Sequence, residues 1–143
     1  MPTLDCPSAQ PEMAGARILG VVAGEADAPR LDYLSEFVAA TPELLATSAP
    51  LDHGEVFRLA GRCEEKRCKH FDGAQCQLAR RIVDALAPVV EKLPPCSIRP
   101  TCRWHRQEGA AACLRCPQIV TSNPRASETL LQVAGAAPPD GYA

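Results

Sequence analysis

The sequence predicts a small α+β domain of short helices and irregular loops, organised around a cysteine-rich module. Its 143 residues are enough for one ordinary domain. Fourteen prolines and nine glycines argue against long helices or a large regular sheet. Aromatic residues make up only 4% of the chain, whereas there are eight cysteines. We therefore expect the cysteines to contribute to folding.

The N-terminal segment is expected to contain one strand and two short helices. The aliphatic and β-branched run Arg17–Ala23 predicts the strand. The sequence Asp27-Ala28-Pro29 predicts the start of the first helix. The apolar residues that would share one face of that helix are Leu31, Leu34, Phe37 and Val38. Thr41, as an N-cap before Pro42, opens the second helix.

The middle of the chain is expected to hold an extended entry segment and one longer helix. Val56–Leu59 should be extended and lead into the cysteine module. Asp72 as an N-cap, with Gln75 three residues later, resembles a capping box and predicts a helix from about Gly73 to Ala87. Cys76 would then lie in the first helical turn, where free N–H groups favour a thiolate.

Charge and composition divide the chain into three parts. Residues 1–57 carry nine acids and two arginines, whereas residues 58–115 carry twelve lysines and arginines and six acids. We expect an acidic segment at 1–57, a cysteine-rich metal- or cluster-binding module at 58–121 and a flexible tail at 122–143, all within one compact domain. Within the tail, a helical turn is expected around Glu128–Val133.

The sequence predicts a cytoplasmic protein. Its longest apolar stretch near the N-terminus, Ile18–Ala23, is shorter than the apolar region of a secretion signal. No apolar run approaches the roughly 18 residues of a membrane span. In a reducing compartment the thiols are expected to be metal ligands or redox centres, with disulfides or free thiols as the alternative.

Seven of the cysteines form two blocks with a similar order of residues. In each block, two cysteines are separated by four or five intervening residues. A basic residue follows, together with an aromatic residue and a histidine, and at least one further cysteine comes later. The blocks are Cys63-x4-Cys68-Lys69-His70-Phe71-x4-Cys76 and Cys96-x5-Cys102-Arg103-Trp104-His105-x7-Cys113-x2-Cys116-Pro117. An internal duplication is one interpretation of this similarity.

The second block contains four thiols within 21 residues, enough to ligate one metal centre. These thiols belong to Cys96, Cys102, Cys113 and Cys116. The final Cys116-Pro117 resembles the Cys-Pro that ends the bacterial ferredoxin run. The resemblance covers about 22 residues, and the full C-x2-C-x2-C-x3-C-P run is absent. It implies a small cysteine-rich bacterial iron–sulfur protein with a [4Fe–4S] cluster.

The first block has three cysteines, Cys63, Cys68 and Cys76, so a second cluster there needs a fourth ligand. Cys6, which is also followed by a proline, and His70 are the main candidates. His53 is a third candidate. Three thiolates alone would leave one iron open to substrate and would make the protein an enzyme.

Zinc is the alternative to iron. Only one C-x2-C knuckle is present, whereas zinc ribbons use two. Tetrahedral zinc needs only four thiolates within reach, so a mixed set remains open. One example combines Cys63 and Cys68 with Cys113 and Cys116.

Three classes of function follow from these observations. The first is an electron carrier or redox accessory protein with one or two [4Fe–4S] clusters and a redox partner protein. The second is a zinc-stapled interaction module, and the third is an enzyme that uses a cluster with an open iron. Nucleic acid is not expected as a partner, because the net charge is −2 and only Trp104, Phe57 and Phe71 could stack on bases in the basic region. Motifs of conventional hydrolases and dinucleotide-binding enzymes are absent.

Overall fold

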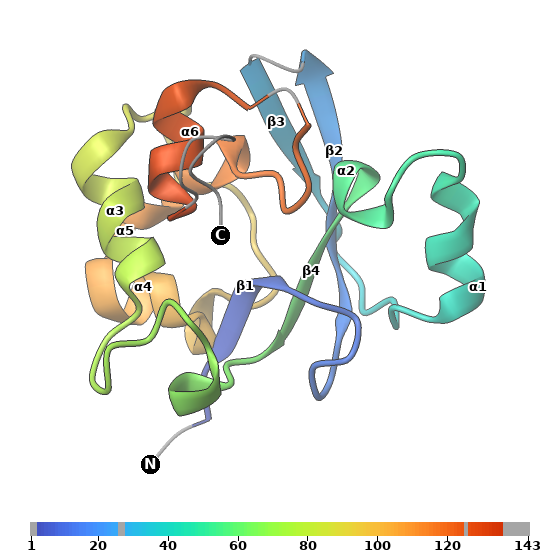
Figure 1. Ribbon diagram of the computed structural model, residues 1–143, viewed down its shortest axis with the longest axis horizontal. Coiled ribbons are helices and arrows are strands. Elements are labelled where there is room, and N and C mark those ends of the chain that lie inside the picture. The colour runs from blue at the N-terminus through green and yellow to red at the C-terminus, as the bar shows by residue number, and fades with distance from the viewer. Residues whose placement is uncertain (1–2, 26–27, 125, 136–143) are drawn as a thin grey trace.

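The structure, a computed structural model, describes residues 3–25, 28–124 and 126–135 (Figure 1). Four antiparallel strands form one sheet in the order β1-β4-β2-β3. The strands are β1 (Asp5–Ala9), β2 (Arg17–Glu25), β3 (Ala28–Tyr33) and β4 (Phe57–Arg62). The helices are α1 (Pro42–Leu45), α2 (His53–Val56), α3 (Gln77–Ala85), α4 (Arg103–Glu108), α5 (Ala110–Cys113) and α6 (Glu128–Val133). The predicted α+β class is confirmed.

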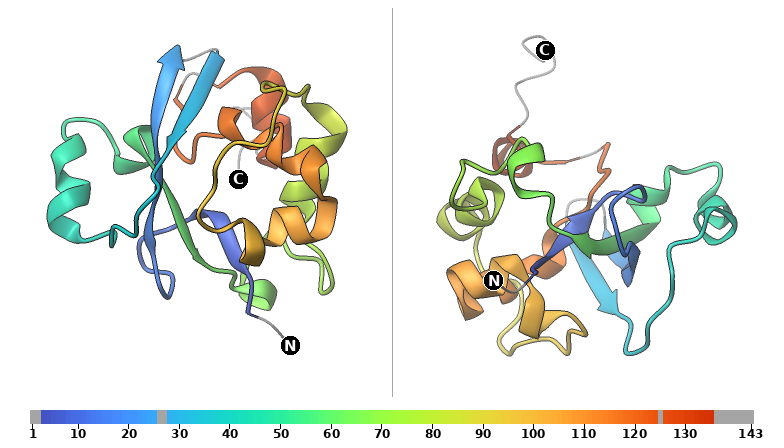
Figure 2. Two further views of the ribbon diagram at one scale, coloured as in Figure 1. Left: turned by 180° about the vertical axis from the view of Figure 1, so that it is seen from behind. Right: turned by 90° about the horizontal axis from the view of Figure 1, so that it is seen from below.

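The sheet separates two groups of helices, with α3 to α6 on one face and α1 on the other (Figures 1 and 2). Neighbouring residues of β2 point to opposite faces, so Leu19 joins the larger core and Ile18 the smaller one. The larger core contains three of the cysteines, Cys76, Cys102 and Cys116. Three of the eight sulfur atoms therefore lie inside the larger core.

The expected strand at 17–23 is confirmed as β2, whereas the helix expected from Asp27 is wrong. Residues 28–33 form β3, which pairs with β2 from Gly20↔Tyr33 to Glu25↔Ala28. Leu31 is buried while its neighbours Arg30 and Asp32 are exposed, a period of two that fits a strand. The apolar residue Phe37, assigned to the helix face, is 73% exposed.

Two further expectations at the N-terminal half are confirmed. Thr41 caps α1, because its Oγ1 accepts a hydrogen bond from the Leu44 N–H at 3.2 Å, with Pro42 at the first helical position. The extended entry segment is confirmed from Phe57, where β4 starts, whereas Val56 is the last residue of α2.

The predicted start of the longer helix is wrong by four residues, because α3 begins at Gln77 with Cys76 as its N-cap. The Asp72 carboxylate does accept hydrogen bonds from the N–H groups of Ala74 and Gln75. These bonds close a tight turn around Gly73, whose φ of +102° is not helical.

The C-terminal segment expected to be flexible contains α6, which matches the predicted turn at Glu128–Val133. This helix packs against α3, and Val133 is only 2% exposed. Residues 136–143 of the tail lie outside the described residues. No helix in the described ranges is long and apolar enough to cross a membrane.

Candidate metal centres

The eight cysteines divide into two sets of four, and each set lines one cavity. The first site is lined by Cys6, Cys63, Cys68 and Cys76. The second site is lined by Cys96, Cys102, Cys113 and Cys116. All eight cysteines lie in the described part of the chain, and each is a free thiol.

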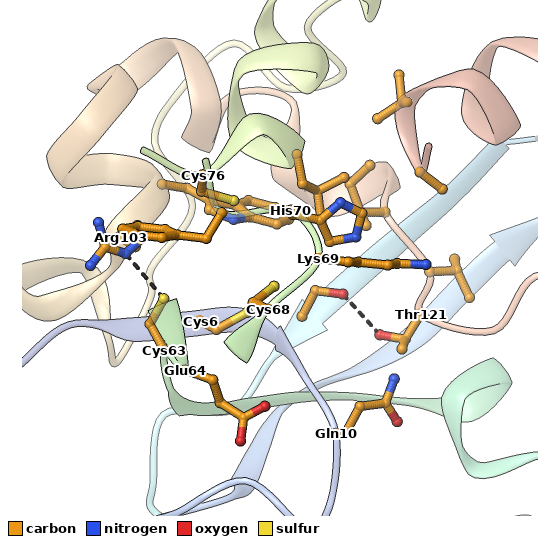
Figure 3. Close-up of a pocket in the computed structure, with 18 of the residues that line it drawn as sticks. Cys6, Gln10, Cys63, Glu64, Cys68, Lys69, His70, Cys76, Arg103 and Thr121 are labelled. Carbon is orange, nitrogen blue, oxygen red and sulfur yellow. Dashed lines mark hydrogen bonds between the residues drawn. The ribbon is translucent and has the colours of Figure 1, made fainter. Parts of the chain in front are cut away.

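The first site is assembled by strand pairing and a helix start. In the β1–β4 ladder, Cys6 lies opposite Gly61, and the Cys63 N–H donates to the Leu4 carbonyl at 2.9 Å. This pairing brings the two cysteines together across 57 residues of sequence. A 3-10 turn then leads to Cys68, and Cys76 stands at the start of α3. Figure 3 shows the four side chains gathered around one space.

The edge position of β1 explains how a Cys-Pro sequence can lie in a strand. Pro7 has no N–H to donate, so it is tolerated at a sheet edge or bulge. The pairing of β1 with β4 shifts register between Cys6 and Ala9, which places Pro7 at that irregularity. Cys6 therefore keeps its place in the ladder beside the first site.

The second site is built from helix ends and 3-10 turns. A turn at Arg99–Thr101 separates Cys96 from Cys102, which caps α4. Cys113 ends α5, and Cys116 opens a further 3-10 turn with Pro117 at its first positions. The short α4 and α5 thus bring the later cysteines back to the earlier ones.

Cys76 and Cys102 occupy the same place in their elements, because both are helix N-caps. Neither side chain forms a capping hydrogen bond. Burial raises the pKa of each thiol, and the backbone N–H groups of the helix start partly offset this rise. Cys76, predicted in the first helical turn, is thus the residue before that turn.

One further thiol at each site lies near a backbone N–H two residues later. Burial raises the pKa of Cys6 and of Cys96, and the N–H groups of Ser8 and Ile98 respectively partly offset this rise.

Arg58 on β4 is fully buried and donates to the second site. Its Nη2 lies 2.7 Å from the Cys116 Sγ, and its other N–H groups donate to the carbonyls of Pro7, Cys116 and Ile119. Its guanidinium also stacks on Trp104, 5.3 Å from the ring centroid. Burial alone would lower the pKa of Arg58, but the neighbouring Cys116 and Tyr33 raise it overall.

Two other side chains contact sulfur atoms of the second site. The Tyr33 hydroxyl donates to Cys116, and burial followed by the Cys116 charge raises the pKa of Tyr33. His105 Nδ1 lies 3.4 Å from the Cys113 Sγ. His105 is therefore a neighbour of a candidate ligand.

Arg103, Lys69, His70 and Glu64 are titratable side chains that line the first site besides its cysteines. Arg103 Nε donates to the Cys63 Sγ at 3.1 Å, and its Nη2 pairs with Glu65 at 2.8 Å. Arg81 Nη2 donates to His70 Nδ1 at 2.8 Å. Burial, Arg81 and Lys69 lower the pKa of His70 to about 4, so the imidazole is neutral at pH 7.

Burial raises the pKa of four of the thiols. It raises the pKa of Cys6 and Cys102 to about 12, and it also raises those of Cys76 and Cys96. The other thiols of the same site add to this effect by like-charge repulsion. Unless positive charge is supplied, these thiols are therefore protonated at pH 7.

The two sites are neighbours. Asp5 forms a backbone bridge with Cys102, so the residue before Cys6 touches a cysteine of the second site. Trp104, which is 2% exposed, lines both cavities. Cys102-Arg103-Trp104 therefore connects the sites, because Cys102 lies in the second and the Arg103 side chain reaches the first.

The structure brings together more of the predicted site residues than the cysteine spacing in the sequence does. It brings together the four cysteines of the second block, and it places both Cys6 and His70 at the first site with the cysteines of the first block. His53 begins α2 and lines neither cavity. The mixed zinc set is not brought together, because its two pairs line different cavities.

Sequence reasoning missed the side chains that contact the sulfur atoms, above all Arg58 and Tyr33. Both lie on strands, and an arginine in a strand gives no sign in the sequence that it is buried. Within the described ranges, no group of three or more His, Cys, Asp or Glu side chains is placed to hold a metal ion.

Comparison with known proteins gave no relative: no family model, no curated protein and no solved structure matches this chain.

Proposed function

We propose that the protein binds two [4Fe–4S] clusters, one at each site, and acts as an electron carrier or redox accessory protein. The observation that carries the proposal is the division of eight free cysteines into two separate sets of four. Four thiolates are the complete ligand set of such a cluster. The N-cap position shared by Cys76 and Cys102 adds to this support, since a thiolate is favoured at a helix N-terminus.

The charge around Arg58 fits a negatively charged centre at the second site. A fully buried guanidinium is strongly unfavourable unless a negative charge lies beside it. Among the described residues Arg58 has no carboxylate partner, and Cys116 is the acidic group that it contacts. A cluster with four thiolates supplies that negative charge, whereas neutral thiols or disulfides do not.

Each bound cluster would supply one-electron transfer, and the chain would bind and tune it. The cysteines would hold the clusters, and Arg58, Tyr33 and the N–H groups would stabilise charge on the sulfur atoms of the second site. Such donors raise a reduction potential. The buried Trp104 and its apolar neighbours exclude water from the second site.

Cys6, and not His70, is proposed as the fourth ligand of the first site. A ligating histidine normally donates a hydrogen bond through its other ring nitrogen. His70 Nδ1 instead accepts from Arg81, which is always a donor, so the ring proton of the neutral imidazole is on Nε2. Nε2 then has no lone pair for a metal.

Anaerobic reconstitution followed by iron, sulfide and zinc analysis tests the function. We expect about eight irons and eight sulfides per chain, as two cubanes require, with a brown colour. Cys6→Ser and Cys96→Ser should each lose about half of the iron, whereas His70→Gln should retain it. A colourless protein with stoichiometric zinc would overturn the proposal in favour of a structural zinc module.

A further inference from the structure

The two sites differ greatly in the space that they enclose. The second site leaves a cavity of about 20 Å³, whereas the first opens into a cavity of about 470 Å³. Because four thiols line each cavity, the number of candidate ligands does not explain the larger volume of the first site. A volume of 470 Å³ lies in the range of small-molecule binding sites.

The wall facing away from the thiols is mainly apolar. It is formed by α6 and by the segment that follows the second site. Its apolar side chains are Ile119, Val120, Ala126, Leu130, Leu131, Val133 and Ala134. Such a wall suits the aliphatic part of a ligand.

One corner of the cavity is cationic. Lys69 and His70 line it, and Arg81 donates to the His70 ring from behind. In the described part of the chain, neither Lys69 nor Arg81 forms an ion pair. Because the bond from Arg81 occupies Nδ1, the His70 ring can still donate through Nε2. This corner therefore favours an anion.

Two hydroxyl groups also belong to the cavity wall, where Ser8 Oγ and Thr121 Oγ1 lie 3.2 Å apart (Figure 3). Each hydroxyl has one proton, so the pair can donate one hydrogen bond to a carboxylate while it keeps the bond between the two hydroxyls. The other polar side chains of the lining are Gln10, Glu64, Arg103 and Asn123.

We propose that the first site also binds a small organic anion with an aliphatic body, such as a medium-chain carboxylate. The carboxylate lies toward Lys69 and His70, and the chain lies along α6. This inference rests on the proposed function only in placing the ligand beside a cluster.

Calorimetric titration of the anaerobically reconstituted full chain with hexanoate tests the inference, with hexan-1-ol and hexylamine as matched probes. Hexanoate should bind with a stoichiometry of one and at least tenfold more tightly than either comparison probe. Lys69→Gln should weaken hexanoate binding at least fivefold. Lys66→Gln removes an exposed charge outside the cavity lining and should leave binding unchanged.

Proton NMR of hexanoate tests where in the protein this ligand binds. Hexanoate protons should be broadened by the paramagnetic centre of the reduced full chain. In Cys6→Ser, which should lack the first cluster, the broadening should fall while calorimetric binding persists. Ala126→Leu, which fills part of the cavity, should abolish binding at unchanged iron content.

Two results would overturn the inference: no heat with any probe at tens of millimolar, or equal affinity for the three probes. The experiment distinguishes failure of this inference from failure of the proposed function. If the chain holds zinc or no metal but still binds hexanoate, the affinity is retained and the broadening is absent.

Discussion

At the scale of the residue, Arg58 links the β-sheet to the second site. Its guanidinium donates to one sulfur and to carbonyls from two separate parts of the chain, at Pro7 and at Cys116 and Ile119. A buried charge requires a counter-charge, and among the described residues the acidic groups beside Arg58 are Cys116 and Tyr33. Thiolates bound to a cluster at the second site would supply that counter-charge.

Replacing Arg58 with methionine should destabilise the fold and weaken the second site. The change leaves three buried carbonyls without their donor, and breaking a buried ionic contact costs roughly 3–5 kcal/mol. We expect a lower urea midpoint and loss of about half of the bound iron. Arg58→Lys should keep more of both, because it retains the charge.

The control for this prediction is Arg62→Met, an exposed arginine on the same strand. It should leave both the midpoint and the iron content close to wild type. If Arg58→Met behaved like this control, the counter-charge argument for the second site would be wrong.

At the scale of the element, α4 holds the start of α3 in place. The Gln107 side chain accepts from the Cys76 N–H and donates to the Cys76 carbonyl, both at 2.8 Å. One amide thus satisfies both backbone groups of a candidate ligand. The two short helices therefore act together in positioning Cys76.

Gln107→Leu should loosen the first site without removing a ligand. Loss of the two hydrogen bonds leaves a partly buried N–H and C=O unpaired and should cost about 1–3 kcal/mol. With a chelator present, iron should leave in two phases, the faster one belonging to the first site. Gln132→Leu, at an exposed position of α6, is the matched control and should release iron as wild type does.

Thr41, the N-cap of α1, lines neither cavity. Thr41→Ala removes the hydrogen bond to the Leu44 N–H and should lower the free energy of unfolding by about 1 kcal/mol. Iron content should not change, because α1 lies on the opposite face of the sheet from α3 to α6 (Figure 2). A fall in iron content would show that the two faces are coupled.

The elements that the sequence could predict are those whose signal is local. The Thr41-Pro42 start and the aliphatic run of β2 need no distant partner, and both are present. The segment that forms β3 resembles a helix in sequence, because the spacing of Leu31 and Leu34 fits a helical face. Pro29, Leu31 and Tyr33 also alternate as in a strand, and the structure has a strand there.

The site was predictable in its residue types but not in its assembly. The cysteine spacing alone groups Cys96 to Cys116, because all four thiols are close in the chain. Cys6 joins the first site through a strand that contains a proline, and such a strand is recognised only when its partner is known. The burial of Arg58 likewise depends on packing among distant segments.

At the scale of the whole molecule, the two cores should respond differently to metal removal. Cys76, Cys102 and Cys116 belong to the larger core, whereas the smaller core of Ala9, Ile18, Leu45 and Leu59 contains no cysteine. Buried sulfur atoms without a centre would leave the larger core poorly packed. Metal binding and folding are coupled in small sites of this kind.

Stripping the metal should therefore remove amide-exchange protection from about Cys63 to Cys116, while β2 and α1 remain partly protected. Exchange measured on the loaded and metal-free protein checks this expectation residue by residue. Equal protection across Cys63–Cys116 in both forms would mean that packing alone holds the cysteine module.

The position of Trp104 has a practical consequence. It is the only tryptophan of the chain, it is buried, and it lines the cavities of both sites. Its indole emission is therefore an intrinsic optical reporter: an absorbing centre in either cavity quenches the fluorescence by energy transfer, and loss of that centre restores part of it. Assembly and breakdown of the two centres can be followed in real time in unlabelled protein.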